Sequence, residues 1–167
     1  LGRRVTQAAG FTMEQVAGIG IAAPGTIDSR DGYVEYANNL PFHHFPIAGL
    51  LKERLGDIPV FVENDANAAA WGEAVAGAAR GTNTSLMITL GTGVGGGIII
   101  DRKVYSGFNG AGGELGHMVI VKDGRPCMCG RRGCWETYSS ATGLIRTTSE
   151  KLEDARKIGK DTVMAEM

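Results

Sequence analysis

Residues Glu114–Glu136 read ELGHMVIVKDGRPCMCGRRGCWE, and they contain all three cysteines of the chain and one of its three histidines. One imidazole and three thiols form the four-ligand set that tetrahedral Zn²⁺ requires in a closed structural site. The candidate ligands are His117, Cys127, Cys129 and Cys134. Cys127 and Cys129 are too close for an easy disulfide, and the nearby glycines allow a tight loop. The stretch predicts a structural zinc loop; reduced thiols beside a surface histidine are the alternative.

Two carboxylates, Glu114 and Glu136, bracket this loop. If a metal ion stiffens the loop, both carboxylates are held in place rather than left free on a surface. Carboxylates accept strong hydrogen bonds from hydroxyl groups, so the pair suits a polyhydroxylated ligand. Solvated glutamates on a glycine-rich loop are the alternative.

A glycine run at Gly91–Gly97 follows an apolar segment and satisfies the pattern G-x-G-x-x-G. A dinucleotide site requires a helix to begin within this pattern. Here Ile98–Ile100 follow, and these β-branched residues favour a second strand, so a hairpin is predicted. Backbone N–H groups in such a turn, with the Thr92 hydroxyl, can bind a phosphate. A plain hairpin remains the alternative, and a Walker-type loop is excluded because no Gly-Lys-Ser/Thr is present.

Asn64 and Asp65 lie between an apolar strand, Pro59–Glu63, and an alanine-rich helix, Ala66–Ala79. Either residue is a good N-cap for that helix. Ligands of open α/β sheets bind at the carboxyl ends of the strands, where a carboxylate beside an amide can orient a hydroxyl and accept its proton. Capping and ligand binding are both open interpretations of this pair.

Strands alternate with helices along the rest of the chain, which predicts an α/β architecture. The Gly81–Asn83 segment is the best candidate boundary between a unit at residues 1–80 and a second unit at 81–167. The further predicted elements are a buried strand (16–23), an edge strand (32–37), a helix (47–55), a strand (85–90), short strands (104–105 and 118–121) and a helix (137–152).

The composition of the 167 residues, with 43% hydrophobic and 21% charged residues, is typical of a globular protein. A net charge of −1 gives no reason to expect nucleic acid or an acidic membrane as a partner. No apolar run is long enough for a membrane span, and no segment resembles a signal peptide. Clustered reduced cysteines favour the cytoplasm. His43 and His44 are interpreted as surface residues without a partner.

Several motifs occur in a fixed order: AAPG, NNLP, VENDANAA, LGTGVGGG, GAGGELGH and CMCGRRGCWE. Together they resemble the ROK family of bacterial sugar kinases and repressors, most closely its glucokinases. The resemblance covers Gly18 to Ile145, and the ordered set is far more specific than any single motif.

The resemblance implies an actin-like, ribonuclease-H-like fold, in which two α/β lobes enclose a sugar in the cleft between them. It implies ATP-dependent phosphorylation of a hexose, glucose to glucose 6-phosphate, with Mg²⁺ bound to ATP. It also suggests a homodimer. The zinc ion would be structural, because all four ligand positions are filled by protein.

The resemblance also implies roles for particular residues. Asp65 matches the catalytic base that takes the proton from the sugar 6-hydroxyl. His117 would bind zinc through one ring nitrogen and face the sugar with the other. The sugar-binding positions are Asn39, Asn64, Asp65, Glu114, His117 and Glu136. The phosphate-binding positions are Gly91, Thr92 and Gly93.

The chain departs from the family pattern at both ends. The Asp-x-Gly-Gly-Thr phosphate loop and the adenine-binding part are not found, so we expect an incomplete fold with little kinase activity by itself. A sugar-responsive ROK repressor core without catalysis is the alternative function, although Asp65 favours a kinase. A dinucleotide-dependent oxidoreductase depends on the glycine run alone, and Ile98–Ile100 argue against it.

Overall fold

A computed structural model describes residues 1–37 and 40–163 of the chain. Asn39, a predicted sugar contact, lies outside the described residues. The helices and short 3₁₀ turns are α1 (Gly2–Ala8), η1 (Met13–Gln15), α2 (Ile47–Leu55), α3 (Asp65–Ala76), η2 (Leu115–His117), α4 (Glu136–Ser139) and α5 (Ala141–Lys157). The strands are β1 (Ile19–Ala23), β2 (Thr26–Asp28), β3 (Tyr33–Tyr36), β4 (His43–Phe45), β5 (Val60–Asn64), β6 (Ser85–Leu90), β7 (Val94–Ile100) and β8 (Lys103–Val104).

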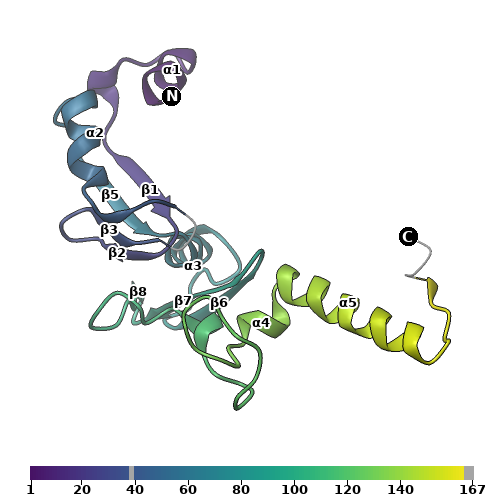
Figure 1. The fold of residues 1–167 in the computed structure, drawn as a ribbon. Helices are drawn as coiled ribbons and strands as arrows, with labels where there is room; N and C mark the ends of the chain where they lie inside the picture. The colour runs from purple at the N-terminus through teal and green to yellow at the C-terminus, as the bar shows by residue number, and fades with distance from the viewer. Residues whose placement is uncertain (38–39, 164–167) are drawn as a thin grey trace.

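Strands β1 and β5 form a parallel pair whose register places Ala23 opposite Asn64. The turn after β1 and the start of α3 therefore lie at the same edge of the sheet (Figure 1). Helix α2 begins and ends as predicted, and Gly56 follows it with a positive φ of 93°, a conformation that glycine adopts without strain.

Strands β2, β3 and β4 form an antiparallel sheet in that order. The prediction of an edge strand at 32–37 was wrong, because β3 pairs on both sides. Both partner strands are only three residues long, too short to show a periodic pattern. His44 was predicted to lack a partner, yet its Nδ1 lies 3.0 Å from the Glu35 carboxylate and its ring stacks on Tyr33.

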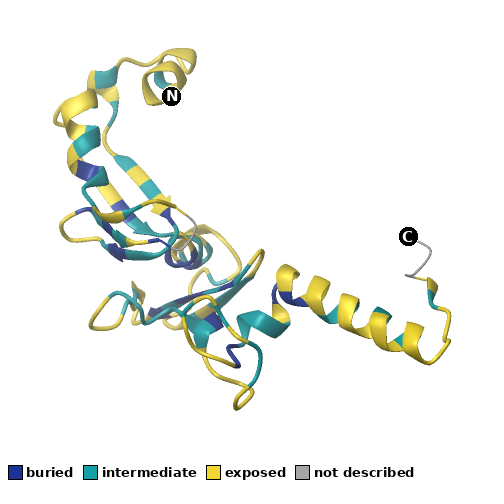
Figure 2. Ribbon diagram, in the orientation of Figure 1, coloured by how far each residue is buried: buried dark blue, intermediate teal, exposed yellow. Residues whose placement is uncertain are grey.

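A hydrophobic core lies between the β1-β5 pair, the β2-β3-β4 sheet and α2. It is formed by small and β-branched side chains. Its buried members are Ala23, Ile27, Val34, Ala37, Ala48 and Val62. Two phenylalanines, Phe42 and Phe45, stack with their ring centroids 4.4 Å apart at its edge. Figure 2 shows buried positions on α2 and on the strands that form this core.

Helix α3 packs closely against β7, which belongs to the antiparallel sheet β6-β7-β8. A Cβ atom at Gly97 would lie 2.5 Å from both the Ala66 carbonyl oxygen and the Ala70 Cβ. A Cβ at Gly95 would lie 3.2 Å from the Ala66 Cβ. The glycines of β7 therefore allow the helix to approach the sheet. The division at residues 80 and 81 remains a prediction, and α3 packs across it.

Residues beyond the third sheet form a loop that runs from η2 to α4. The strand predicted at 118–121 was wrong: only an isolated bridge joins Val119 to Cys134. The helix predicted at 137–152 is two helices, because Ser140 has an extended backbone and caps α5 through a hydrogen bond from the Gly143 N–H to its Oγ. Helix propensity does not reveal such a break.

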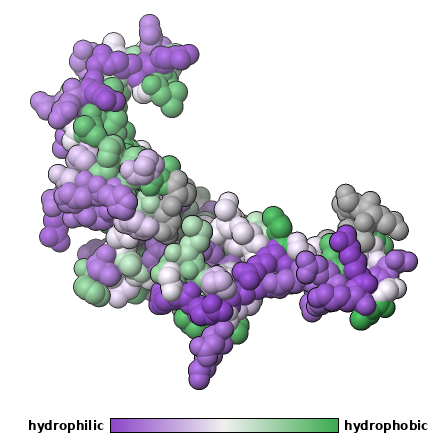
Figure 3. All heavy atoms as spheres, viewed as in Figure 1, coloured by the Kyte–Doolittle hydropathy of each residue, from purple (hydrophilic) through white to green (hydrophobic). Residues whose placement is uncertain are grey.

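Helix α5 extends away from the other elements (Figure 1), and most of its residues are exposed (Figure 2). Figure 3 shows hydrophilic residues along much of this helix. Among the described residues, no helix combines the length and apolar character needed to cross a membrane.

Candidate functional site

A cleft of about 690 Å³ lies where α3, the β6-β7 turn, η2 and the α4–α5 segment meet. Its lining includes most of the residues that the sequence singled out: Asn64, Asp65, Gly91, Thr92, Gly93, Glu114, His117, Cys127 and Glu136. Cys129 and Cys134 are not among the lining residues, although they join the same metal cluster. Segments that are distant in sequence therefore contribute to one cleft.

Asn64 and Asp65 make different contacts at the start of α3. Asn64 is the N-cap of α3, and its Oδ1 accepts hydrogen bonds from the N–H groups of Ala66 (2.9 Å) and Asn67 (3.1 Å). Its Nδ2 donates to the Gly25 carbonyl oxygen at 3.0 Å. Asp65 is exposed and lines the cleft, with one oxygen accepting from the Ala66 N–H at 3.0 Å. The Asp65 carboxylate thus retains acceptor positions for a ligand.

Glu63 and Asn67 support this junction, although the sequence reasoning overlooked them. The Glu63 carboxylate accepts hydrogen bonds from the Asn64 N–H (2.8 Å), the Asn67 Nδ2 (3.1 Å) and the Ser29 hydroxyl (3.1 Å). Asn67 is only 3% exposed. The one sequence feature that could have indicated this hydrogen-bond network is Asn67, a polar residue in an alanine-rich helix.

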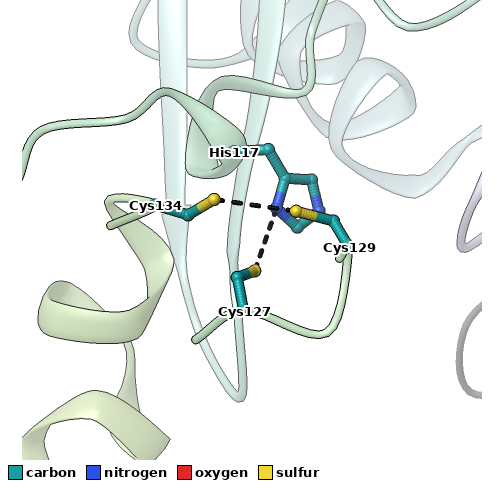
Figure 4. A group of neighbouring side chains, drawn as sticks. All are labelled: His117, Cys127, Cys129 and Cys134. Atoms are coloured by element: carbon teal, nitrogen blue, oxygen red, sulfur yellow. Dashed lines mark hydrogen bonds between the residues drawn. The ribbon is translucent and has the colours of Figure 1, made fainter. Parts of the chain in front are cut away.

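The four predicted metal ligands come together (Figure 4), with their ligand atoms all within 4.8 Å of one another. His117 Nδ1 lies 3.6 Å from Cys127 Sγ, and Cys129 Sγ lies 3.6 Å from Cys134 Sγ. Bonds of about 2.0 Å to nitrogen and 2.3 Å to sulfur place neighbouring ligands of tetrahedral Zn²⁺ about 3.5–3.8 Å apart. The donor set and its spacing therefore fit a closed zinc site after a small contraction.

The thiols of this cluster have unequal proton affinities. Burial raises the pKa of Cys134 to about 12, and burial also raises the pKa of Cys127. Burial acts in the same direction on Cys129, but hydrogen bonds from the Arg131 backbone and side chain, and from the other thiols, outweigh it and lower its pKa to about 6. Because zinc binds thiolates, metal binding at neutral pH would release protons from Cys127 and Cys134.

His117 connects the metal cluster to the cleft. Its Nδ1 faces Cys127, and its Nε2 lies 3.9 Å from Glu114 Oε2. A metal ion on Nδ1 leaves the proton on Nε2, which then points toward acceptors at the Glu114 side. The division of roles between the two ring nitrogens, one for zinc and one for the sugar, remains a prediction.

The β6-β7 turn is held by the segment that follows the metal loop. Glu136 Oε2 accepts a hydrogen bond from the Val94 N–H at 3.0 Å. The Ala141 N–H donates to the Gly91 carbonyl oxygen (2.9 Å), and the Thr142 hydroxyl donates to the Thr92 carbonyl oxygen (2.8 Å). These three contacts were not foreseen from the sequence, because they join residues 42 to 50 positions apart.

Most glycines of the run that resembles a phosphate loop have a packing role. Besides Gly95 and Gly97, Gly96 lies against Leu115, whose Cδ1 would be 2.6 Å from an added Cβ. Gly93 lies against Glu136, and only Gly91 has open space at its Cβ position. Glycine content alone is therefore weak evidence for a phosphate site; the position of the turn in the cleft is stronger evidence.

Arg125 anchors the metal loop to α4 and α5. Its guanidinium donates to the Thr137 carbonyl oxygen (2.9 Å) and the Thr147 hydroxyl (3.0 Å), and it pairs with Glu150. The guanidinium also lies over the Tyr138 ring, 4.8 Å from its centroid. Its side chain is only 14% exposed. Sequence reasoning missed this residue, since nothing distinguishes it from the other arginines of the loop.

Known proteins share both the sequence and the arrangement of this chain. The ROK family model matches residues 4–163. A glucokinase of Halalkalibacterium halodurans is 44% identical over 141 residues, covering 84% of this chain and 42% of that protein. A xylose repressor of Bacillus spizizenii is 41% identical over 134 residues, covering 80% of this chain and 34% of that protein.

A solved structure is similar to this chain in both sequence and fold. A ROK family glucokinase from Streptomyces griseus, in complex with glucose and AMPPNP, is 41% identical with a TM-score of 0.75. The match covers 92% of this chain and 50% of that one. The chain thus spans half or less of the length of these relatives. The fold is that of the actin-like sugar kinases, as the sequence predicted.

Proposed function

Because the chain belongs to the ROK family, we propose that the protein transfers the γ-phosphoryl group of ATP to a hydroxyl of a hexose, with glucose the first candidate. One observation carries the proposal: the exposed Asp65 carboxylate lines the same cleft as the Glu114–His117 pair, Glu136 and the β6-β7 turn. A base, a set of sugar-binding groups and a phosphate-binding turn in one cleft are the parts that this reaction needs.

In the proposed reaction, Asp65 accepts the proton of the attacking hydroxyl. Its position at the first residue of α3 is braced by the Asn64 cap and by Glu63. A correctly placed base contributes about a hundred- to ten-thousand-fold to the rate. Because phosphoryl transfer depends mainly on positioning and charge stabilisation, a rigid junction matters as much as the basicity of the carboxylate.

The sugar would be held by Glu114, His117 and Glu136, with the Asn64 amide beside them. The turn at residues 91–93 would bind ATP phosphate through its N–H groups and the Thr92 hydroxyl, and Mg²⁺ would arrive with the nucleotide. His117, Cys127, Cys129 and Cys134 would hold a zinc ion, whose contribution is to stiffen the loop that positions these carboxylates.

The test replaces the base. In the full-length protein, Asp65→Asn should lower kcat for ATP-dependent phosphorylation of glucose by about a hundredfold or more, with the Kd for glucose changed by only a few-fold. Asp57→Asn removes an equally exposed carboxylate in the turn after α2 and should leave kcat unchanged. Equal kcat values for Asp65→Asn and the wild type would refute the assignment.

A sugar-responsive repressor core is the second candidate, supported by the similarity to the xylose repressor of B. spizizenii. Such a protein would bind a sugar in the same cleft without turnover. Sugar binding by the wild-type protein, with no ADP formed from ATP, would favour this alternative. The division into lobes at 1–80 and 81–167, the homodimer and the cytoplasmic location remain predictions.

A further inference from the structure

We propose that Glu136 positions the phosphate-binding turn in addition to contacting the sugar, so that one carboxylate links the two halves of the cleft. The inference rests on the proposed function and adds a residue-level connection between its two subsites. It is carried by the hydrogen bond from the Val94 N–H to Glu136 Oε2, at 3.0 Å across 42 residues of sequence.

The close approach of Gly93 supports the same conclusion independently. A Cβ atom at Gly93 would lie 2.3 Å from Glu136 Oε2 and 3.2 Å from its Cδ. Gly93 does not have a positive φ, so the backbone conformation itself does not require glycine. The absence of a side chain at Gly93 instead makes room for the Glu136 carboxylate.

The turn is fixed from its other side by α5, through the bonds that Ala141 and Thr142 make to the Gly91 and Thr92 carbonyl oxygens. Glu136 lies only two residues after the metal-ligand position Cys134, which is fully buried. The position of the turn therefore depends on the segment that the metal loop holds, and Glu136 is the only acidic side chain that hydrogen-bonds to the turn among the described residues.

A carboxylate can accept several hydrogen bonds, and no bond to the second oxygen of Glu136, Oε1, occurs within the described part of the chain. A sugar hydroxyl can therefore donate to Oε1 while Val94 keeps its bond to Oε2. A carboxylate held at both oxygens has less freedom, so an occupied sugar subsite restricts the turn. Binding free energies are reciprocal, so a displaced turn should in turn weaken sugar binding.

The experiment replaces the residue of the turn that faces Glu136 and leaves Glu136 itself unchanged. Gly93→Ala should displace the carboxylate and raise the Kd for glucose at least about tenfold, measured by calorimetry without nucleotide. Gly20→Ala is the control for glucose binding, because Gly20 lies in β1 outside the residues that line the cleft, and the same methyl group meets no atom within 4 Å there. Its Kd for glucose should stay within about twofold of the wild-type value.

A second measurement needs no variant. Saturating glucose should slow the hydrogen exchange of the Val94 amide in the wild-type protein at least about fivefold, the lower range of ordinary coupling between sites. If the wild type binds glucose but Gly93→Ala and Gly20→Ala have equal affinities for glucose, or Val94 exchange is unchanged, the link through Glu136 is refuted and the kinase proposal stands. A wild-type protein that binds neither glucose nor any other hexose refutes both proposals.

Discussion

Replacement of Arg125 by methionine should destabilise the metal loop by about 3 kcal/mol. The lost hydrogen bonds to the Thr137 carbonyl oxygen and the Thr147 hydroxyl contribute about 1 kcal/mol each. The guanidinium over the Tyr138 ring contributes about 0.5–1 kcal/mol, and the ion pair with the half-exposed Glu150 adds little because solvent screens it. Methionine retains much of the apolar packing of the arginine stem, so the loss comes mainly from polar contacts.

The assay is urea denaturation of the zinc-loaded protein, followed by tryptophan fluorescence, because Trp135 adjoins the metal-ligand position Cys134. Arg146→Met is the matched control: Arg146 also contacts Glu150, at 3.1 Å, but its side chain is 47% exposed. An exposed pair of this kind contributes about 0.5 kcal/mol or less. Equal losses of stability in the two variants would show that Arg125 does not anchor the loop.

Two further predictions concern the metal and the contact between α3 and β7. Elemental analysis should find about one zinc per chain, and Cys134→Ser should lose most of it together with much of the glucose affinity; full glucose binding by the metal-free protein would contradict this. Gly97→Ala should lower the free energy of unfolding by about 1–3 kcal/mol, because its Cβ would overlap Ala66 and Ala70. Gly20→Ala is the control: its Cβ has open space, so the free energy of unfolding should change little. Equal melting temperatures for these two alanine variants would contradict the packing role of Gly97.

The sequence alone predicted the features that depend on neighbouring residues. Helix α2 was predicted from its spacing and the glycine after it, and α3 from its alanines and the Asn64–Asp65 cap. The cluster of His117, Cys127, Cys129 and Cys134 was predicted because zinc selects a small set of residue types that lie close together in sequence. The actin-like fold was predicted from six motifs in order, and it is confirmed by the solved relatives.

Other features were decided only by the tertiary structure, because they join segments that propensity and spacing cannot connect. The central position of β3, the bond from Val94 to Glu136 and the anchoring of the metal loop by Arg125 all depend on which segments become neighbours after folding. The glycine run shows the difference well. Its residues suggested a phosphate site by their order, but in the folded chain most of them make room for α3, Leu115 and Glu136, because only a glycine lets those groups approach the backbone so closely.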